Sequence, residues 1–127
     1  VNEIGNYDGV RPLFYDGRVL LEIEADGQWS IVIRAITLSD KPIMNLSGKG
    51  DYATPLFTPN PRGEQIYLMQ HSGQSNFIVY LHCESGSYLI ENEIGRRRDI
   101  VLVDFGSEGV CMWEVQADGR WSIQLRR

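Results

Sequence analysis

The chain has 127 residues, 43% of them hydrophobic and 23% charged, which suits one globular domain, or one domain with part of a second. Its formal net charge of -5 argues against a nucleic-acid partner, because phosphate binding needs a cationic surface, and Arg96-Arg97-Arg98 is the one local exception. No apolar run approaches the roughly 20 residues of a membrane-spanning helix, and a start at Val1 without Met or signal peptide fits a processed or excised product.

The first predicted elements lie in residues 1–36, and this segment recurs at the other end of the chain. Residues 22–34 read EIEADGQWSIVIR, residues 114–126 read EVQADGRWSIQLR, and eight of these thirteen positions are identical. The preceding motif Asn2-Glu3-Ile4-Gly5 recurs at Asn92-Glu93-Ile94-Gly95. Residues 1–34 and 91–126 are therefore two copies of one unit, whereas residues 35–90 have no second copy.

Each copy has the pattern of a β-hairpin. Apolar and polar residues alternate with period two on both sides of Asp26-Gly27 in the first copy and of Asp118-Gly119 in the second, as in two strands joined by a tight turn. We expect the first hairpin to pack within the chain, in a larger pseudo-symmetric sandwich; the alternative is completion by another polypeptide through strand exchange. Its apolar face, which is too large to stay in water, comprises Leu21, Ile23, Trp29, Ile31 and Ile33.

The middle of the chain is also predicted to form strands, because turn signals recur there every 8–12 residues. Residues 47–62 are interpreted as a loop with one short strand at 52–57. The further predicted strands are 64–71, 76–83, 87–91, which leads into residues 92–95, and 99–105, with turns at 72–75 and 84–86.

These patterns predict an all-β fold, an antiparallel and jelly-roll-like β-sandwich with an internal half-repeat. Residues 46–127 are expected to form one complete sandwich of about seven strands. Residues 1–36 are the half-repeat, either the C-terminal half of a preceding copy or strands integrated into the same sandwich.

Four motifs stand in order along the chain: residues 48–51 (GKGD), 71–79 (HSGQSNFIV), 92–95 (NEIG) and 117–123 (ADGRWSI). As a set they resemble a small repeated β-sandwich domain of bacterial cell-surface, lipoprotein and secreted proteins. The resemblance covers residues 46–127 once and residues 1–34 in part. It implies a sandwich, a bacterial source and an extracellular or cell-surface location, and it supplies no catalytic residues. The chain departs from the pattern at residues 96–98, where a Tyr-Ser-Gly-like turn is expected.

The sequence predicts no catalytic or metal-ligating set, and its candidate binding residues are mostly polar side chains at turns and strand ends. We interpret His71 as hydrogen-bonded to its own turn, since no nucleophile elbow surrounds it as a general base would require. Asn92 and Glu93, like Asn2 and Glu3, offer too few oxygens for calcium. The candidate binding residues, with no cofactor assigned, are His71, Ser75, Asn76, Tyr80, Asn92, Glu93, Arg96 and Arg97.

Two repeated pairs of residues allow more than one interpretation. Trp29 and Trp121 share the parity of the Ile and Leu residues that follow them, which favours the core over sugar-stacking platforms. Glu22 and Glu114 suggest a pair of glycosidase carboxylates, but a solvated strand face is the better explanation.

The cysteines and one histidine are placed by the alternation. Cys83 and Cys111 have no zinc or redox spacing and fall on apolar faces, so they are predicted to be buried thiols, with a disulfide as the alternative. His82 alternates out of phase with Phe77 and Leu81 and is predicted to be exposed.

Together these features predict a non-enzymatic binding or assembly module that acts through protein–protein contacts or self-association, without nucleic acid and without a membrane span. The alternative is a carbohydrate-binding module, which needs two or more exposed aromatic residues with polar neighbours on one face. Once the Trp residues are assigned to the core, the candidates are Tyr7, Tyr15, Tyr52, Tyr67, Tyr80 and Tyr88.

Overall fold

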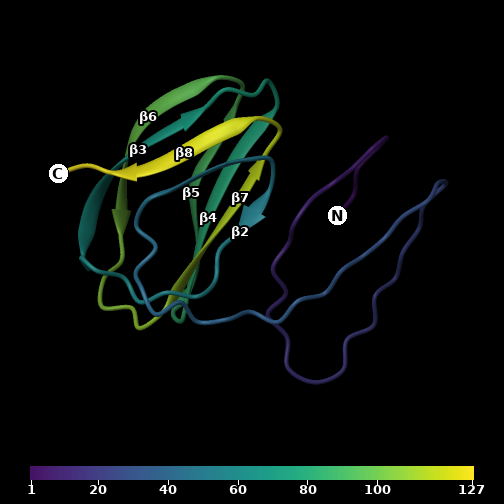
Figure 1. The fold of residues 1–127 in the computed structure, drawn as a ribbon, viewed down its shortest axis with the longest axis horizontal. Coiled ribbons are helices and arrows are strands. Elements are labelled where there is room, and N and C mark those ends of the chain that lie inside the picture. Colours follow the sequence, from purple (N-terminus) through teal and green to yellow (C-terminus); the bar gives the residue numbers. More distant parts are fainter.

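The computed structural model describes all residues from 1 to 127 and confirms the predicted all-β class. Two antiparallel sheets of four strands each face one another (Figure 1). The chain forms no helix that would be long and apolar enough to cross a membrane. The strands are β1 (Leu46–Lys49), β2 (Tyr52–Ala53), β3 (Glu64–His71), β4 (Asn76–Cys83), β5 (Gly86–Ile94), β6 (Arg97–Asp104), β7 (Cys111–Ala117) and β8 (Arg120–Leu125).

The sandwich is assembled from two interleaved halves of the chain, which we call the N-half (residues 46–90) and the C-half (residues 91–127). One sheet has the order β1-β8-β3-β6 and the other β2-β7-β4-β5. Strands β6, β7 and β8 therefore pair only with strands of the N-half, and the C-half end of β5 pairs with β4. No two strands of the C-half are hydrogen-bonded to each other in a ladder, so neither half forms its sheets alone.

The predicted hairpin turn at Asp118-Gly119 is wrong, because β7 and β8 lie in different sheets. The turn is a corner at which the chain crosses the sandwich. Gly119 is required there by a close approach and not by a positive φ: a Cβ atom on it would lie 2.6 Å from the backbone nitrogen of Gly73. Among consecutive strands, only β4 and β5 pair as a hairpin.

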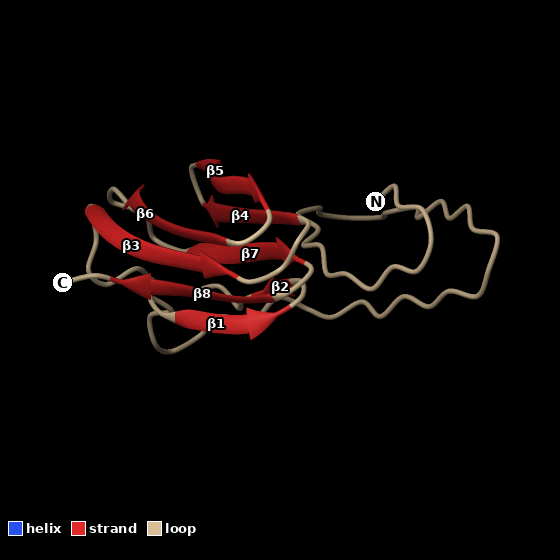
Figure 2. Cartoon of the chain, turned by 90° about the horizontal axis from the view of Figure 1, so that it is seen from above, coloured by secondary structure: helices blue, strands red, loops and turns tan.

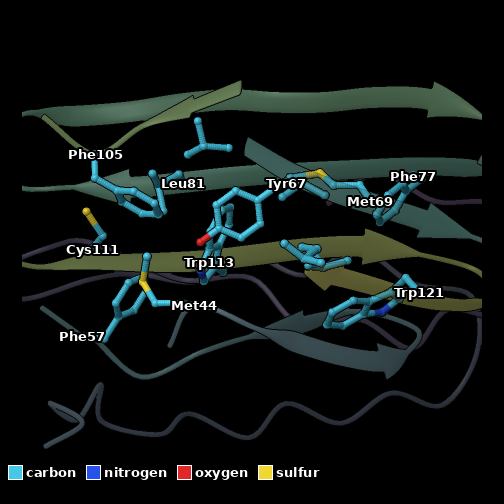
Figure 3. Packing of buried hydrophobic residues seen from close by; sticks show 14 residues of the cluster. Met44, Phe57, Tyr67, Met69, Phe77, Leu81, Phe105, Cys111, Trp113 and Trp121 are labelled. Atoms are coloured by element: carbon cyan, nitrogen blue, oxygen red, sulfur yellow. The ribbon is translucent and has the colours of Figure 1, made fainter. Parts of the chain in front are cut away.

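The core lies between the two sheets and is rich in aromatic side chains (Figure 3). Trp113 packs edge-on against Tyr67, with ring centroids 5.6 Å apart, and against Phe105, at 6.0 Å. The predicted core face of β4 is confirmed at Phe77, where no surface is exposed, and Trp121 is only 3% exposed. Burial raises the pKa of Tyr67, whose hydroxyl has no hydrogen-bond partner.

The two cysteines form a disulfide, so the prediction of free thiols is wrong. Cys83 on β4 and Cys111 on β7 are direct cross-strand partners, with Cα atoms 4.1 Å apart. The alternation correctly places both residues on apolar faces, but it is the register between two strands distant in sequence that brings the sulfur atoms together. Sequence spacing carries no information on that register.

The structure also differs from the sequence expectation in the stretch of residues 47–62. It holds two short strands, β1 and β2, instead of one strand at 52–57, which makes eight strands in the sandwich. Residue Gly48 of β1 pairs with Trp121, and a Cβ atom on Gly48 would lie 2.9 Å from the indole ring. The absence of a side chain at Gly48 therefore lets β1 lie flat beside the ring.

Residues 1–36 lie outside the sandwich, and the expected packing of their hairpin into a larger core is wrong. No strand is formed before Leu46, apart from a single bridge between Leu38 and Leu56. The segment extends from one end of the sandwich as an open excursion (Figure 2). Trp29, expected in the core, is 59% exposed. The reason is that strands of a C-half pair only with strands of an N-half. The one N-half of this chain already pairs with residues 91–127.

Candidate functional site

Three of the sequence motifs meet at one corner of the sandwich, where side chains of one half bind backbone of the other. Asp118 accepts hydrogen bonds through Oδ2 from the backbone N–H groups of Gln74, at 3.0 Å, and Ser75, at 2.9 Å. Trp121 donates its indole N–H to the carbonyl oxygen of Gly50 at 2.8 Å. Through these contacts Asp118 and Trp121 connect the C-half to the N-half.

The GKGD motif, residues 48–51, supplies further hydrogen bonds between the two halves. Asp51 accepts the backbone N–H of Ala117 through Oδ1 at 3.0 Å. The backbone N–H of Gly50 donates to the carbonyl oxygen of Gly119 at 3.1 Å. The motifs that stood out in the sequence therefore hold the N-half and the C-half together at this corner.

His71, the first candidate binding residue, is a buried part of the same corner. Its Nδ1 lies 2.8 Å from the carbonyl oxygen of Gly95, so it does not bond its own turn as predicted. Its ring stacks on Phe77 at 4.9 Å. Its Nε2 lies 3.1 Å from Asp118 Oδ1, an ion-pair distance whose direction falls short of a hydrogen bond. The imidazole thus faces the interior of this corner and is not open to a ligand.

Asp118 has a lowered pKa because of this environment. Burial of the carboxyl group works in the opposite direction and raises the pKa, but the backbone hydrogen bonds from Gln74 and Ser75 and the charge of His71 outweigh it. The folded pKa therefore lies below the ordinary value of 3.8. A carboxylate of this kind stabilises the fold above its unfolded pKa, and the stabilisation is lost as the pH falls through the folded pKa.

We expect Asp118→Asn to lower the free energy of unfolding at pH 7 by about 1 kcal/mol, a modest value because the carboxylate is partly exposed. The difference from the unchanged chain should shrink below about pH 4 as the carboxylate protonates. Urea unfolding at several pH values measures both effects. Asp26→Asn in the first copy is the matched control and should change neither quantity. An Asp118→Asn chain with an unchanged pH profile would contradict the assignment.

Three more candidate residues lie near this corner with exposed side chains. The backbone carbonyl of Ser75 accepts the N–H of Gly95 at 2.9 Å. Asn76 begins β4 opposite Ile94, and Asn92 lies on β5 opposite Ile78. The structure thus brings Ser75, Asn76 and the Asn92 strand to the same end of the sandwich, where their side chains are open to solvent.

The charged candidates form a separate group around the turn between β5 and β6. Arg97 lies 3.8 Å from Glu93 and 2.9 Å from Asp99, measured from its Nη2 atom to the carboxylate oxygens. Arg96 is exposed at the turn itself and makes no ion pair. Because Arg97 is already paired, Arg96 is the cation of the group that remains open to a partner.

A second region, on the outer face of the β2-β7-β4-β5 sheet, is not predicted by the sequence. His82 was expected to be exposed and Glu114 to lie on a solvated face, yet their side chains are only 13% and 6% exposed. His82 Nε2 lies 2.8 Å from Glu114 Oε1, and Gln116 donates to Glu114 Oε2 at 2.9 Å. The alternation is correct, but the two side chains shield each other on this face, and the ring of Phe14 from the N-terminal segment lies 5.1 Å from that of His82.

The same face has a line of hydrogen-bonding groups beside a hollow. The hydroxyl of Ser87 lies 2.6 Å from His82 Nδ1, so hydroxyl, imidazole and the Glu114 carboxylate follow in order. Nucleophilic catalysis uses this order, but Ser87 and His82 are direct cross-strand partners, and a cross-strand hydrogen bond explains their contact. The hollow, of about 310 Å³, is lined by Phe14, Leu56, His82, Cys83, Glu84, Gly86, Ser87 and Val110. Tyr80, the remaining candidate, stacks on His82 at 5.6 Å and is separate from the corner.

The third region is the apolar face of the first copy. The segment is tied to the sandwich at its base, where Arg11 forms a 2.6 Å ion pair with Asp51. Beyond that point its apolar face is open: Val19, Leu21, Ile23, Trp29 and Ile31 are 39–59% exposed, while their counterparts Cys111, Trp113, Val115, Trp121 and Ile123 are 0–3% exposed.

No group of three or more His, Cys, Asp or Glu side chains is arranged to hold a metal ion. Asn2 and Glu3 are exposed near the N-terminus, which lies away from the sandwich and from β5, the strand that carries Asn92 and Glu93 (Figure 1). No protein-family model and no curated protein matches the chain.

Proposed function

We propose that the chain is a non-enzymatic assembly module that binds protein through the apolar face of residues 1–36, as part of a multidomain or surface protein. The observation that supports this is the difference in exposure between the two copies of the repeat. The apolar positions that are buried in the C-half are 39–59% exposed in the first copy. A contiguous apolar surface of this kind is typical of an interaction site.

The shape of the segment supports the same proposal. Its apolar side chains are not scattered but gather around a hollow of about 250 Å³, lined by Leu13, Tyr15, Val19, Leu21 and Ile33. Full burial of such side chains is worth about 1.5–3 kcal/mol each. A partner that covers several of them gains enough free energy to offset the cost of ordering the segment.

We expect the purified chain to associate as its concentration rises, because the exposed apolar face of residues 1–36 favours contact with other apolar surfaces even without its natural partner. Leu21→Ser with Ile31→Ser should reduce the association. The matched control is Leu20→Ser with Val32→Ser, which removes apolar side chains of the opposite parity that are even more exposed, and it should have little effect. Sedimentation velocity over about a hundredfold range of concentration measures the mass of the species formed by each variant.

A mass that stays monomeric at all concentrations, or that falls equally in both double variants, would contradict the proposal.

The second candidate is carbohydrate binding at the hollow beside Phe14, His82 and Tyr80, where aromatic rings stand next to polar groups. Binding to a glycan array that is lost in Phe14→Ser, with no concentration dependence of the mass, would favour that candidate.

A further inference from the structure

We propose that residues 1–36 are themselves a C-half, and that the partner for their apolar face is a separate N-half, a polypeptide of the same kind as residues 46–90. The two would form a second β-sandwich like that of residues 46–127. The inference rests on the proposed assembly function and names the partner. This proposal is more specific than non-specific apolar association, because it states which backbone and side-chain groups of the two halves must come into contact.

The first argument is that the first copy carries the residues by which a C-half binds an N-half. In the complete sandwich Asp118 binds the backbone of residues 74–75, Gly119 packs on Gly73, and Trp121 donates to Gly50. The identical residues of the first copy are Asp26, Gly27 and Trp29. None of these three has such a contact here, since Trp29 is exposed and a Cβ atom on Gly27 would meet nothing within 4 Å.

The second argument is that one glycine of the first copy has the backbone φ of its counterpart in the complete sandwich. Gly95 has a φ of 87°, and its counterpart Gly5 has a φ of 86°. This left-handed conformation is one that glycine adopts readily. In the sandwich Gly95 uses it to donate its N–H to Ser75 and to offer its carbonyl to His71. Gly5 has nearly the same φ without an N-half beside it.

The third argument is a count of halves, which excludes a second copy of this chain as the partner. Each chain has two C-halves, residues 1–36 and 91–127, and a single N-half. Two chains bring four C-halves and two N-halves together, so two C-halves stay open in any exchange of strands between them. All strand partners of a C-half come from an N-half. An additional N-half is therefore the occupant that completes residues 1–36.

The test is to supply that N-half. In the complete sandwich residue 90 is followed by Glu91, which aligns with Val1 in the repeat. A variant with a second copy of residues 37–90 placed directly before Val1 therefore presents an N-half to residues 1–36 in the native order. The full chain is retained, and its own sandwich serves as an internal reference.

Two readouts follow the first copy. Arg18 and Arg34 are exposed tryptic sites in the unextended chain, and in the extended chain their cleavage should slow by about two orders of magnitude or more, because cleavage then waits for a packed sandwich to open. The emission of Trp29 should shift to shorter wavelength as the ring leaves water. Gly48→Leu in the added segment alone is the control, since a side chain there meets the tryptophan ring in the complete sandwich, and it should restore fast cleavage.

Unchanged cleavage after Arg18 and Arg34, or an added segment that stays sensitive to trypsin, would overturn the proposal. If concentration-dependent association through Leu21 and Ile31 persists in that case, the assembly function stands and its partner is of another kind. If that association is absent as well, both the partner and the assembly function are refuted.

Discussion

Trp121→Ala is expected to lower the free energy of unfolding by about 3–5 kcal/mol, the range for deletion of a large buried aromatic side chain. Trp121 is 3% exposed, packs against Gly48 and donates its N–H to Gly50. The substitution removes apolar contacts and also leaves the Gly50 carbonyl without its partner, so a cavity and a lost hydrogen bond act together.

The repeat provides a matched control for this prediction. Trp29→Ala changes the same residue in the same motif, but at a position that is 59% exposed, and it should cost about 0.5 kcal/mol or less. Urea unfolding monitored by circular dichroism measures both variants without relying on the fluorescence of the residues replaced. Equal losses of stability in the two variants would show that residues 1–36 belong to the same cooperative unit as the sandwich.

Removal of the disulfide is expected to have the second largest effect. Cys83 and Cys111 are 28 residues apart in sequence, and closing a loop of that length stabilises a fold by about 3–4 kcal/mol through the entropy of the unfolded chain. The double variant Cys83→Ser with Cys111→Ser should therefore unfold at much lower urea concentration than the oxidised chain.

Reduction of the unchanged chain is the companion measurement. A reducing agent should lower its stability toward that of the double variant and should leave the double variant itself unaffected. Cys111 is fully buried in the core, so part of the loss in the double variant comes from burying a serine hydroxyl. Val at both positions controls for this contribution, because it restores an apolar side chain without the covalent link. No difference between oxidised and reduced chains would contradict the prediction.

The sequence was sufficient for the elements whose signal is local. Strands β3 and β4 are predicted at their observed limits, because turn signals mark their ends and, in β4, apolar residues alternate along the strand. The core positions of Phe77 and Trp121 follow from the same alternation. Strand β1 was missed because its residues, LSGK, show no alternation, and its place depends on the ring of Trp121 beside Gly48.

The candidate site was only partly accessible from the sequence. The ADGxW repeat drew attention to Asp118 and Trp121, yet their roles as joints depend on loops 48–51 and 72–75, which are distant in sequence. His82 and Glu114 were assigned to the solvent because alternation reports which face a residue occupies and not whether another segment covers that face. On this face the two side chains contact each other, and Phe14 from the N-terminal segment lies against His82.

By itself, the sequence determined the all-β class, the repeat and the parity of its apolar faces, since each of these depends on residues close together along the chain. The tertiary structure alone decided which strands pair. It placed β7 and β8 in different sheets, joined Cys83 to Cys111, and left residues 1–36 without an N-half. The physical reason is that the backbone hydrogen bonds between paired strands do not depend on side chains. They therefore do not specify, in the sequence of either strand, which distant strand is its partner. The partner is fixed only when packing between the sheets and close contacts such as Gly73 with Gly119 are satisfied together.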